Sequence, residues 1–209
     1  LAAIFQPAPP FCLAILARYN RLTMLTLTLF GSPQIKIHDA PIHIRRRRGL
    51  ALLIYLAVTQ RPHSREALAN LLWSDYEQKD AFANLRRELA RLRKDVGQAR
   101  IGANRKQVWL EDAANIWVDC VAFEAHLQAG EVETAVSLAT ADFLVGFSLP
   151  DALVFEEWVL FERERLQIQL GQQLAQLVAN ALAHQAAAAN EAAEAVLHAK
   201  RWIALDPFH

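Results

Sequence analysis

The stretch DAFANLRRELARLRKDV, residues 80–96, decides the fold of this chain. Its apolar residues recur every three or four positions, at Phe82, Leu85, Leu89, Leu92 and Val96. This spacing lines one face of a helix. At about 100° per residue, four polar residues fall within about 40° of the pole opposite Leu89, namely Asn84, Arg87, Arg91 and Lys94. The stretch therefore predicts an amphipathic helix that buries one face and presents a basic one.

The residues before this helix predict a helix-turn-helix. Ser64 is a good N-cap for a helix over 65–73, and Glu66 lies favourably in its first turn. A polar loop, 74–79, then leads to Asp80, which we expect to cap the basic helix.

Strand patterns enclose these helices. Before them, three short segments predict a small antiparallel sheet: 25–30, 34–37 and 42–44. After Gly97, which ends the basic helix, residues 100–111 predict a β-hairpin with a polar tip at Asn104, Arg105 and Lys106.

A further helix is predicted over 49–60, apolar on most faces and therefore buried. Four consecutive arginines, 45–48, lead into it and oppose the positive end of the helix dipole. Either full solvation or a nearby phosphate or acidic surface would explain them, and the sequence leaves both readings open.

Three strands, three helices and a hairpin make a winged helix-turn-helix. An isolated basic helix is usually a solvated surface, but this context favours DNA binding. In the major groove Arg pairs with guanine and Asn with adenine, so Asn84, Arg87, Arg91 and Lys94 are the expected readers. Arg86 and Arg93 flank the apolar stripe, and we expect them to reach phosphates or to bridge to acids such as Glu88. The hairpin tip would place Arg105 or Lys106 at the DNA backbone or minor groove.

The second half of the chain is helical. Long helices are predicted from about 155 to 184 and from about 190 to 205, where alanine and leucine alternate at helical spacing. Paired helices of this kind stack in solenoid repeats. Five aromatic residues are expected to form its core, Phe143, Phe147, Phe155, Trp158 and Phe161.

Charge separates the two halves, although the 209-residue chain has a formal net charge of zero. Residues 25–111 carry sixteen bases and eight acids, whereas residues 112–209 carry four bases and fourteen acids. This asymmetry predicts two domains with different partners, the basic one suited to a polyanion. Residues 1–24 are predicted to be a disordered extension.

Composition argues against several other classes. The two cysteines, Cys12 and Cys120, offer neither a disulfide framework nor a zinc spacing, which favours the cytoplasm. No apolar run is long enough to cross a bilayer. The chain has no Gly-rich phosphate loop and no HExxH or GxSxG motif, so no enzyme, cofactor or metal site is expected.

Seven segments in order resemble one known family: SREALANLLW, NLRRELARLRK, the VWL strand, WVDCVAFEAHL, DFLVGF, LPDALVFEEWVLFERERL and ALDPFH. They are similar to the bacterial transcriptional activator family, of the type of the Streptomyces antibiotic regulatory proteins. The resemblance implies an α+β chain with an OmpR-type winged helix-turn-helix over 25–111. A tetratricopeptide-like bacterial transcriptional activation domain, all helical, would follow over 112–209.

The resemblance also implies roles. The recognition helix would be 80–96, the wing 100–110, and the loop 74–79 a contact for RNA polymerase. The helical domain would serve dimerisation or signal coupling, with a homodimer binding direct repeats in promoter DNA. Because family chains continue with further helices, we expect the domain to be truncated at its C-terminus. Two alternatives stay open: a helical-repeat scaffold that binds proteins, and the sensory front of a larger regulatory ATPase.

Overall fold

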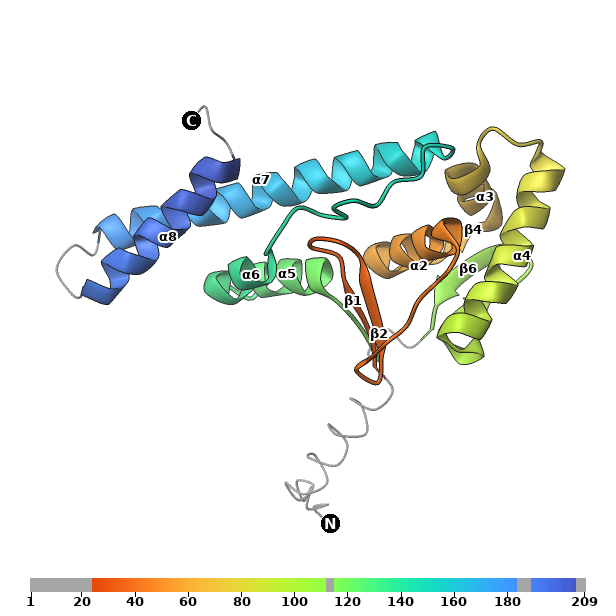
Figure 1. The fold of residues 1–209 in the computed structure, drawn as a ribbon, viewed down its shortest axis with the longest axis horizontal. Helices are drawn as coiled ribbons and strands as arrows, with labels where there is room; N and C mark the ends of the chain where they lie inside the picture. The colour runs from red at the N-terminus through yellow and green to blue at the C-terminus, as the bar shows by residue number, and fades with distance from the viewer. Residues whose placement is uncertain (1–23, 112–114, 184–188, 206–209) are drawn as a thin grey trace, which may run out of the picture. The chain divides into compact units, whose positions relative to one another are not determined.

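The computed structural model describes residues 24–111, 115–183 and 189–205, and it has the expected α+β architecture (Figure 1). The predicted extension lies outside the described residues except for Met24. Within the described ranges, no helix combines the length and the apolar character needed to span a membrane.

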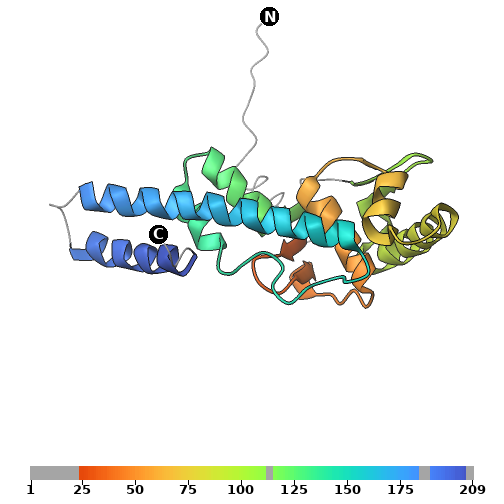
Figure 2. The same cartoon turned by 90° about the horizontal axis from the view of Figure 1, so that it is seen from above.

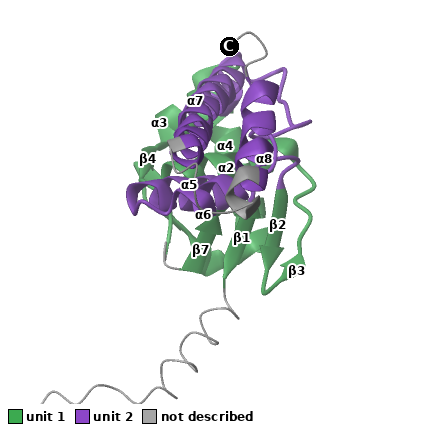
Figure 3. Ribbon diagram, turned by 90° about the vertical axis from the view of Figure 1, so that its left-hand side faces the viewer, with its two compact units in different colours: residues 1–27, 34–70, 76–118 green, residues 28–33, 71–75, 119–209 purple. Residues whose placement is uncertain are grey.

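The chain forms two compact units, each built from separate stretches of sequence (Figure 3). Unit 1 contains residues 1–27, 34–70 and 76–118, and unit 2 contains residues 28–33, 71–75 and 119–209. Both units therefore draw on both sides of the boundary predicted after residue 111. The functional division into a DNA-binding and an activation domain stays a prediction.

The larger sheet of unit 1 has the order β3-β2-β1-β7, from Ala40–Pro41, Gln34–Ile37, Leu25–Thr28 and Ile116–Val118. The predicted strand at 42–44 is wrong, because the chain turns back sooner. His38 and Asp39 have φ angles of 56° and 62°, which fits a two-residue type I′ hairpin. The purely antiparallel sheet is also wrong, since β1 pairs in parallel with β7, Leu25 opposite Ile116.

Three helices follow the first strands: α2 (Arg47–Thr59), α3 (Arg65–Trp73) and α4 (Gln78–Val96). The cap on α3 is confirmed, because the Ala67 N–H donates to Ser64 Oγ at 3.0 Å. Asp80 is not the N-cap of α4. The Asp80 N–H donates to the Glu77 carbonyl, so the helix begins earlier. Asp80 therefore lies within the first turn, where its charge still favours the positive end of the dipole.

The predicted hairpin is confirmed as β5 (Ile101–Ala103) and β6 (Gln107–Leu110). A short 3₁₀ turn, η1 (Gln98–Arg100), joins α4 to β5. A third strand was not expected. β4 (His63–Ser64) pairs with β6 and leads directly into α3. The β5–β6 hairpin, called the wing below, is therefore tied to the start of α3.

Unit 2 contains α5 (Asp119–Gln128), α6 (Val132–Leu138), α7 (Leu153–Ala183) and α8 (Ala189–Leu205). The two long predicted helices are confirmed, and they lie side by side (Figures 1 and 2). Phe143 and Phe155 are buried, but Phe161 is 71% exposed, so its predicted place in the core is wrong. Phe161 lies two positions after the buried Val159, about 200° around the helix.

A buried carboxylate fixes the start of α5 within unit 2. Asp119 Oδ2 accepts hydrogen bonds from the N–H groups of Leu29 (2.7 Å) and Phe30 (2.8 Å). Asp119 Oδ1 accepts one from the Cys120 N–H at 2.8 Å. Burial raises the pKa of Asp119 above its usual value, and the backbone N–H donors oppose that rise.

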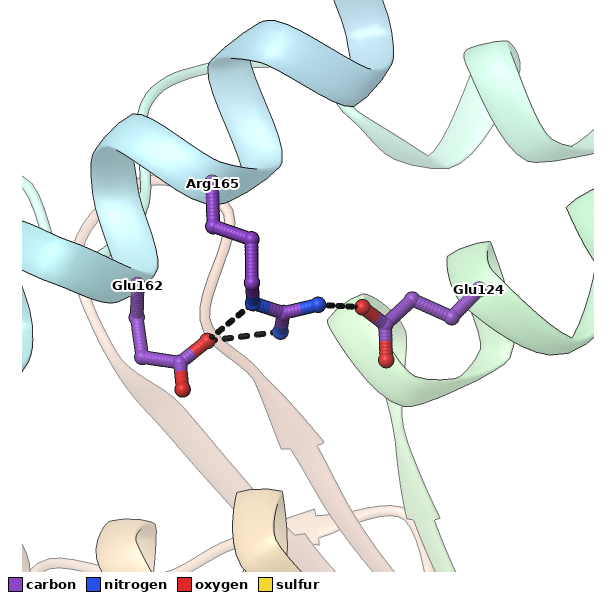
Figure 4. A network of polar contacts seen from close by, with 3 residues as sticks. All are labelled: Glu124, Glu162 and Arg165. Atoms are coloured by element: carbon purple, nitrogen blue, oxygen red, sulfur yellow. Dashed lines mark hydrogen bonds and ion pairs between the residues drawn. The ribbon is translucent and has the colours of Figure 1, made fainter.

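An arginine joins α5 to α7 on the surface of unit 2 (Figure 4). Arg165 donates to Glu162 on its own helix and to Glu124 on α5. Within unit 2 these two acids therefore take part in linking α5 to α7.

Candidate nucleic-acid interface

The basic helix α4 has one buried and one exposed face, as the sequence predicts. Of the predicted stripe, Leu85, Leu89, Leu92 and Val96 are buried, together with Ala81, and α4 packs against α2. Phe82, the fifth residue of the predicted stripe, is only partly buried. On the remaining surface Arg86, Arg87, Arg91 and Lys94 are exposed, and Asn84 is partly buried. Four cationic side chains of one helix are therefore available to an anionic partner.

Two of the predicted readers are already paired with each other. Arg87 Nη2 donates to Asn84 Oδ1 at 2.9 Å, and Arg87 Nε donates to the Ala83 carbonyl at 3.3 Å. The bond orders the guanidinium along the helix surface. The Asn84 amide keeps both N–H donors, and one of them could donate to an adenine N7.

Glu88 is the exception on this helix, an acid that is only 6% exposed. It lies 3.7 Å from Arg91 and 3.9 Å from Arg46. A Cβ added to Gly49, in the first turn of α2, would lie 2.8 Å from Glu88 Oε1. The carboxylate thus sits where the dipole of α2 favours an anion, and it partly offsets the arginines at 45–48. Among the described residues Glu88 is an acidic group beside Arg46, while Arg45, Arg46 and Arg47 remain exposed.

The expectation that Glu88 pairs with Arg86 or Arg93 is wrong. Glu88 lies about 100° to one side of Leu89, whereas both arginines lie on the other side of the apolar stripe. Arg93 instead donates from Nε and Nη2 to the Ile101 carbonyl, at 3.1 and 2.9 Å. Arg93 therefore holds the wing against α4. This role depends on where the hairpin lies, so it could not be predicted from the periodicity of the helix.

The tip of the wing is an ordered turn with two exposed bases. Asn104 Oδ1 accepts hydrogen bonds from the N–H groups of Lys106 (2.8 Å) and Gln107 (2.7 Å), as in an Asx turn. Arg65 Nε donates to the Asn104 carbonyl at 2.9 Å. Because its backbone is held in this way, the tip presents Arg105 and Lys106 to solvent from a fixed position.

Gly102 sets the packing of the wing. It lies opposite Trp109 in the hairpin, and a Cβ at this position would overlap the Trp109 indole and the Glu111 carboxylate. We expect Gly102→Ala to displace the indole and to lower the free energy of unfolding by about 1–3 kcal/mol. Urea unfolding followed by tryptophan fluorescence measures the loss. Ala103→Gly, at the neighbouring position, is the control, and an equal loss there would contradict the role of the indole.

An aromatic contact that the sequence pattern does not reveal lies beside α3 and α4. The Arg48 guanidinium lies 5.5 Å from the centre of the Tyr76 ring, and Tyr76 is exposed in the loop between α3 and α4. Arg48 belongs to the run of arginines at 45–48, but no periodicity or spacing in the sequence links this residue to Tyr76. This contact adds a cationic group next to the loop.

No metal centre is visible in the part of the chain that the structure describes, where no group of three or more His, Cys, Asp or Glu side chains could hold an ion. Cys120 is buried as a free thiol, and burial raises its pKa far above the usual value. His63 is also buried, and its Nε2 lies 2.7 Å from Thr59 Oγ1. These groups contribute to packing.

No family model matches the sequence, and no curated protein matches it either. Among solved structures, EmbR of Mycobacterium tuberculosis, in a complex with a low-affinity phosphopeptide, is similar in fold. The TM-score is 0.51 at 20% sequence identity, over 76% of this chain and 49% of that one. This chain thus spans about half the length of that EmbR chain. The structure is therefore an α+β fold that is also found in EmbR.

Proposed function

We propose that this chain is a sequence-specific DNA-binding transcriptional activator. The observation that carries the proposal is the exposed basic face of α4, opposite an apolar face buried against α2. A merely solvated helix would not need a second helix, α3, immediately before it and a basic hairpin after it. Here α3 precedes α4, and the exposed residues Arg105 and Lys106 extend the cationic surface to the hairpin.

In this proposal α4 lies in the major groove with Asn84, Arg87, Arg91 and Lys94 toward the bases. Arg91 can leave Glu88, because a single contact at 3.7 Å with 45% of its side chain exposed stabilises the pair weakly. Arg86 would bind a phosphate. Arg93 would act through the wing, since two of its nitrogen atoms are engaged by Ile101.

The second unit would support assembly on DNA. We propose a homodimer on direct repeats, with the helical unit serving dimerisation or signal coupling as in the family that the sequence resembles. The loop 74–79, in which Asp75, Tyr76 and Glu77 are exposed, would contact RNA polymerase. We also propose that the helical unit is tetratricopeptide-like and that the protein is located in the cytoplasm.

The test begins with selection of bound duplexes from a random pool, followed by mobility-shift titration of the selected site. Arg87→Ala with Arg91→Ala should weaken specific binding at least about tenfold, because each bidentate base contact contributes about 1–3 kcal/mol. Where a lost contact is to a phosphate, the salt slope should fall by about 0.9.

A matched control removes the same charge elsewhere. Lys36→Ala with Lys200→Ala changes two cations outside α4 and the wing, and it should leave the affinity for the selected site nearly unchanged. Unchanged affinity in the Arg87/Arg91 variant would sink the assignment of the reading face. If no duplex is selected at all, the protein-binding scaffold becomes the better reading.

A further inference from the structure

Unit 2 contains a cavity that the proposed DNA-binding function does not use. It has a volume of about 200 Å³ and lies between the loop after α6, the middle of α7 and the end of α8. One liquid water occupies about 30 Å³, whereas sites for drug-sized ligands measure about 300–1,000 Å³. The cavity therefore suits a small metabolite.

The walls of the cavity are largely apolar and held in place. Phe30, Phe143, Leu166, Leu170 and Leu205 line it. The Phe30 ring meets the Phe123 ring edge-on, with 5.7 Å between centroids. Backbone hydrogen bonds join Gly31 to Asp142 and Leu144 to Leu29. An apolar body could enter without reshaping these walls.

Two arginines make the cavity cationic within an acidic half of the chain. Arg163 Nε donates to the Phe143 carbonyl at 3.1 Å, and among the described residues its terminal nitrogens have no protein acceptor. Arg201 is bonded to the carbonyls of Val136 and Ala139 at the end of α6. Asp142, the one acid among the described residues that line the cavity, accepts from Gln167 Nε2 at 3.0 Å. Two cations against one anion favour an anionic ligand.

We propose that this cavity binds a small organic monocarboxylate with an apolar or aromatic body. The terminal nitrogens of Arg163 match the two oxygens of a carboxylate, since a guanidinium and a carboxylate form paired hydrogen bonds. Arg201 adds a second positive charge, and the leucine and phenylalanine side chains cover the rest of the ligand. Because the site lies in the helical unit, its occupation would provide a chemical input distinct from DNA.

The test uses phenylacetate and hexanoate as carboxylate probes and phenylacetamide as the neutral match. Binding to the full 209-residue chain is followed by ligand-observed NMR and by calorimetry. We expect phenylacetate to bind with a dissociation constant of about 1 mM or lower, which is reasonable for a ligand of its size. Phenylacetamide should bind at least about tenfold more weakly, because it lacks the charge-assisted pair.

Two variants probe the two halves of the site. Arg163→Gln should weaken phenylacetate binding at least about tenfold and leave phenylacetamide nearly unaffected. Ala204→Phe adds an aromatic ring at a residue that lines the cavity and should abolish binding of both probes. Glu133→Gln, at an exposed acid on α6, is the control and should bind as the parent chain does.

Each contrary outcome overturns the proposal. Equal affinity for phenylacetate and phenylacetamide would show that the site does not recognise a carboxylate. Unchanged binding in Ala204→Phe would show that the probe binds outside this cavity. Failure of every probe to bind the folded parent chain would also reject it. DNA binding by the same preparations is scored separately, so loss of one function is not mistaken for loss of the other.

Discussion

Replacing Asp119 by alanine is expected to lower the free energy of unfolding by about 3–5 kcal/mol, because three buried backbone N–H groups lose their acceptor. The side chain is 2% exposed, and its two oxygens accept from three backbone N–H groups. Alanine leaves the donors of Leu29, Phe30 and Cys120 buried without an acceptor, and each such group costs about 1–3 kcal/mol. Urea unfolding followed by circular dichroism measures the loss.

Asp119→Asn keeps one hydrogen-bond acceptor oxygen but removes the negative charge, so it distinguishes the contributions of the two. The amide oxygen can still accept from Leu29 and Phe30, so the loss should be smaller than in the alanine variant. Glu133→Ala, an exposed acid on α6, should change stability by no more than about 0.5 kcal/mol. A loss in Asp119→Ala as small as in Glu133→Ala would show that the hydrogen bonds from Leu29 and Phe30 do not hold α5 to this segment.

Leu85→Ala should lower the free energy of unfolding by about 3–5 kcal/mol through a cavity between α4 and α2. Leu85 is completely buried on the apolar face of α4. The neighbouring wall cannot collapse freely, because the Glu88 carboxylate and Gly49 already fix the approach of the two helices nearby. Chemical denaturation reports the change in the transition midpoint.

The same substitution at an exposed leucine supplies the control. Leu160 is 61% exposed on α7, so Leu160→Ala should stay within about 0.5 kcal/mol of the parent chain. Equal losses at Leu85 and Leu160 would mean that helix propensity rather than burial sets the cost. In that case the apolar stripe would not define the inner face of α4.

What could be predicted from the sequence follows from local periodicity. The stripe of α4, the Ser64 cap and the hairpin after Gly97 each depend on neighbours within a few residues, and all three are confirmed. The outward direction of the α4 basic side chains follows from the same geometry. Whether they read DNA depends on a partner and stays a prediction.

What could not be predicted depends on contacts between distant parts of the chain. β7 is three residues long and β4 only two, too short for alternation to be recognised. The partners of Glu88 come partly from another helix. Phe161 lies in the same aromatic-rich segment as Phe155 and Trp158. Its exposure is decided by its angular position around the axis of α7.

The parallel pairing of β1 with β7 also has a consequence for how the chain folds as it is synthesised. Residues 25–27 meet residues 116–118, so about ninety residues must emerge before this contact can close. Contacts of such long sequence separation form slowly. The helices and the hairpin between them can form first, because their contacts are local. Until Ile116–Val118 arrives, β1 has an open edge, and an unpaired edge strand invites pairing with another nascent chain.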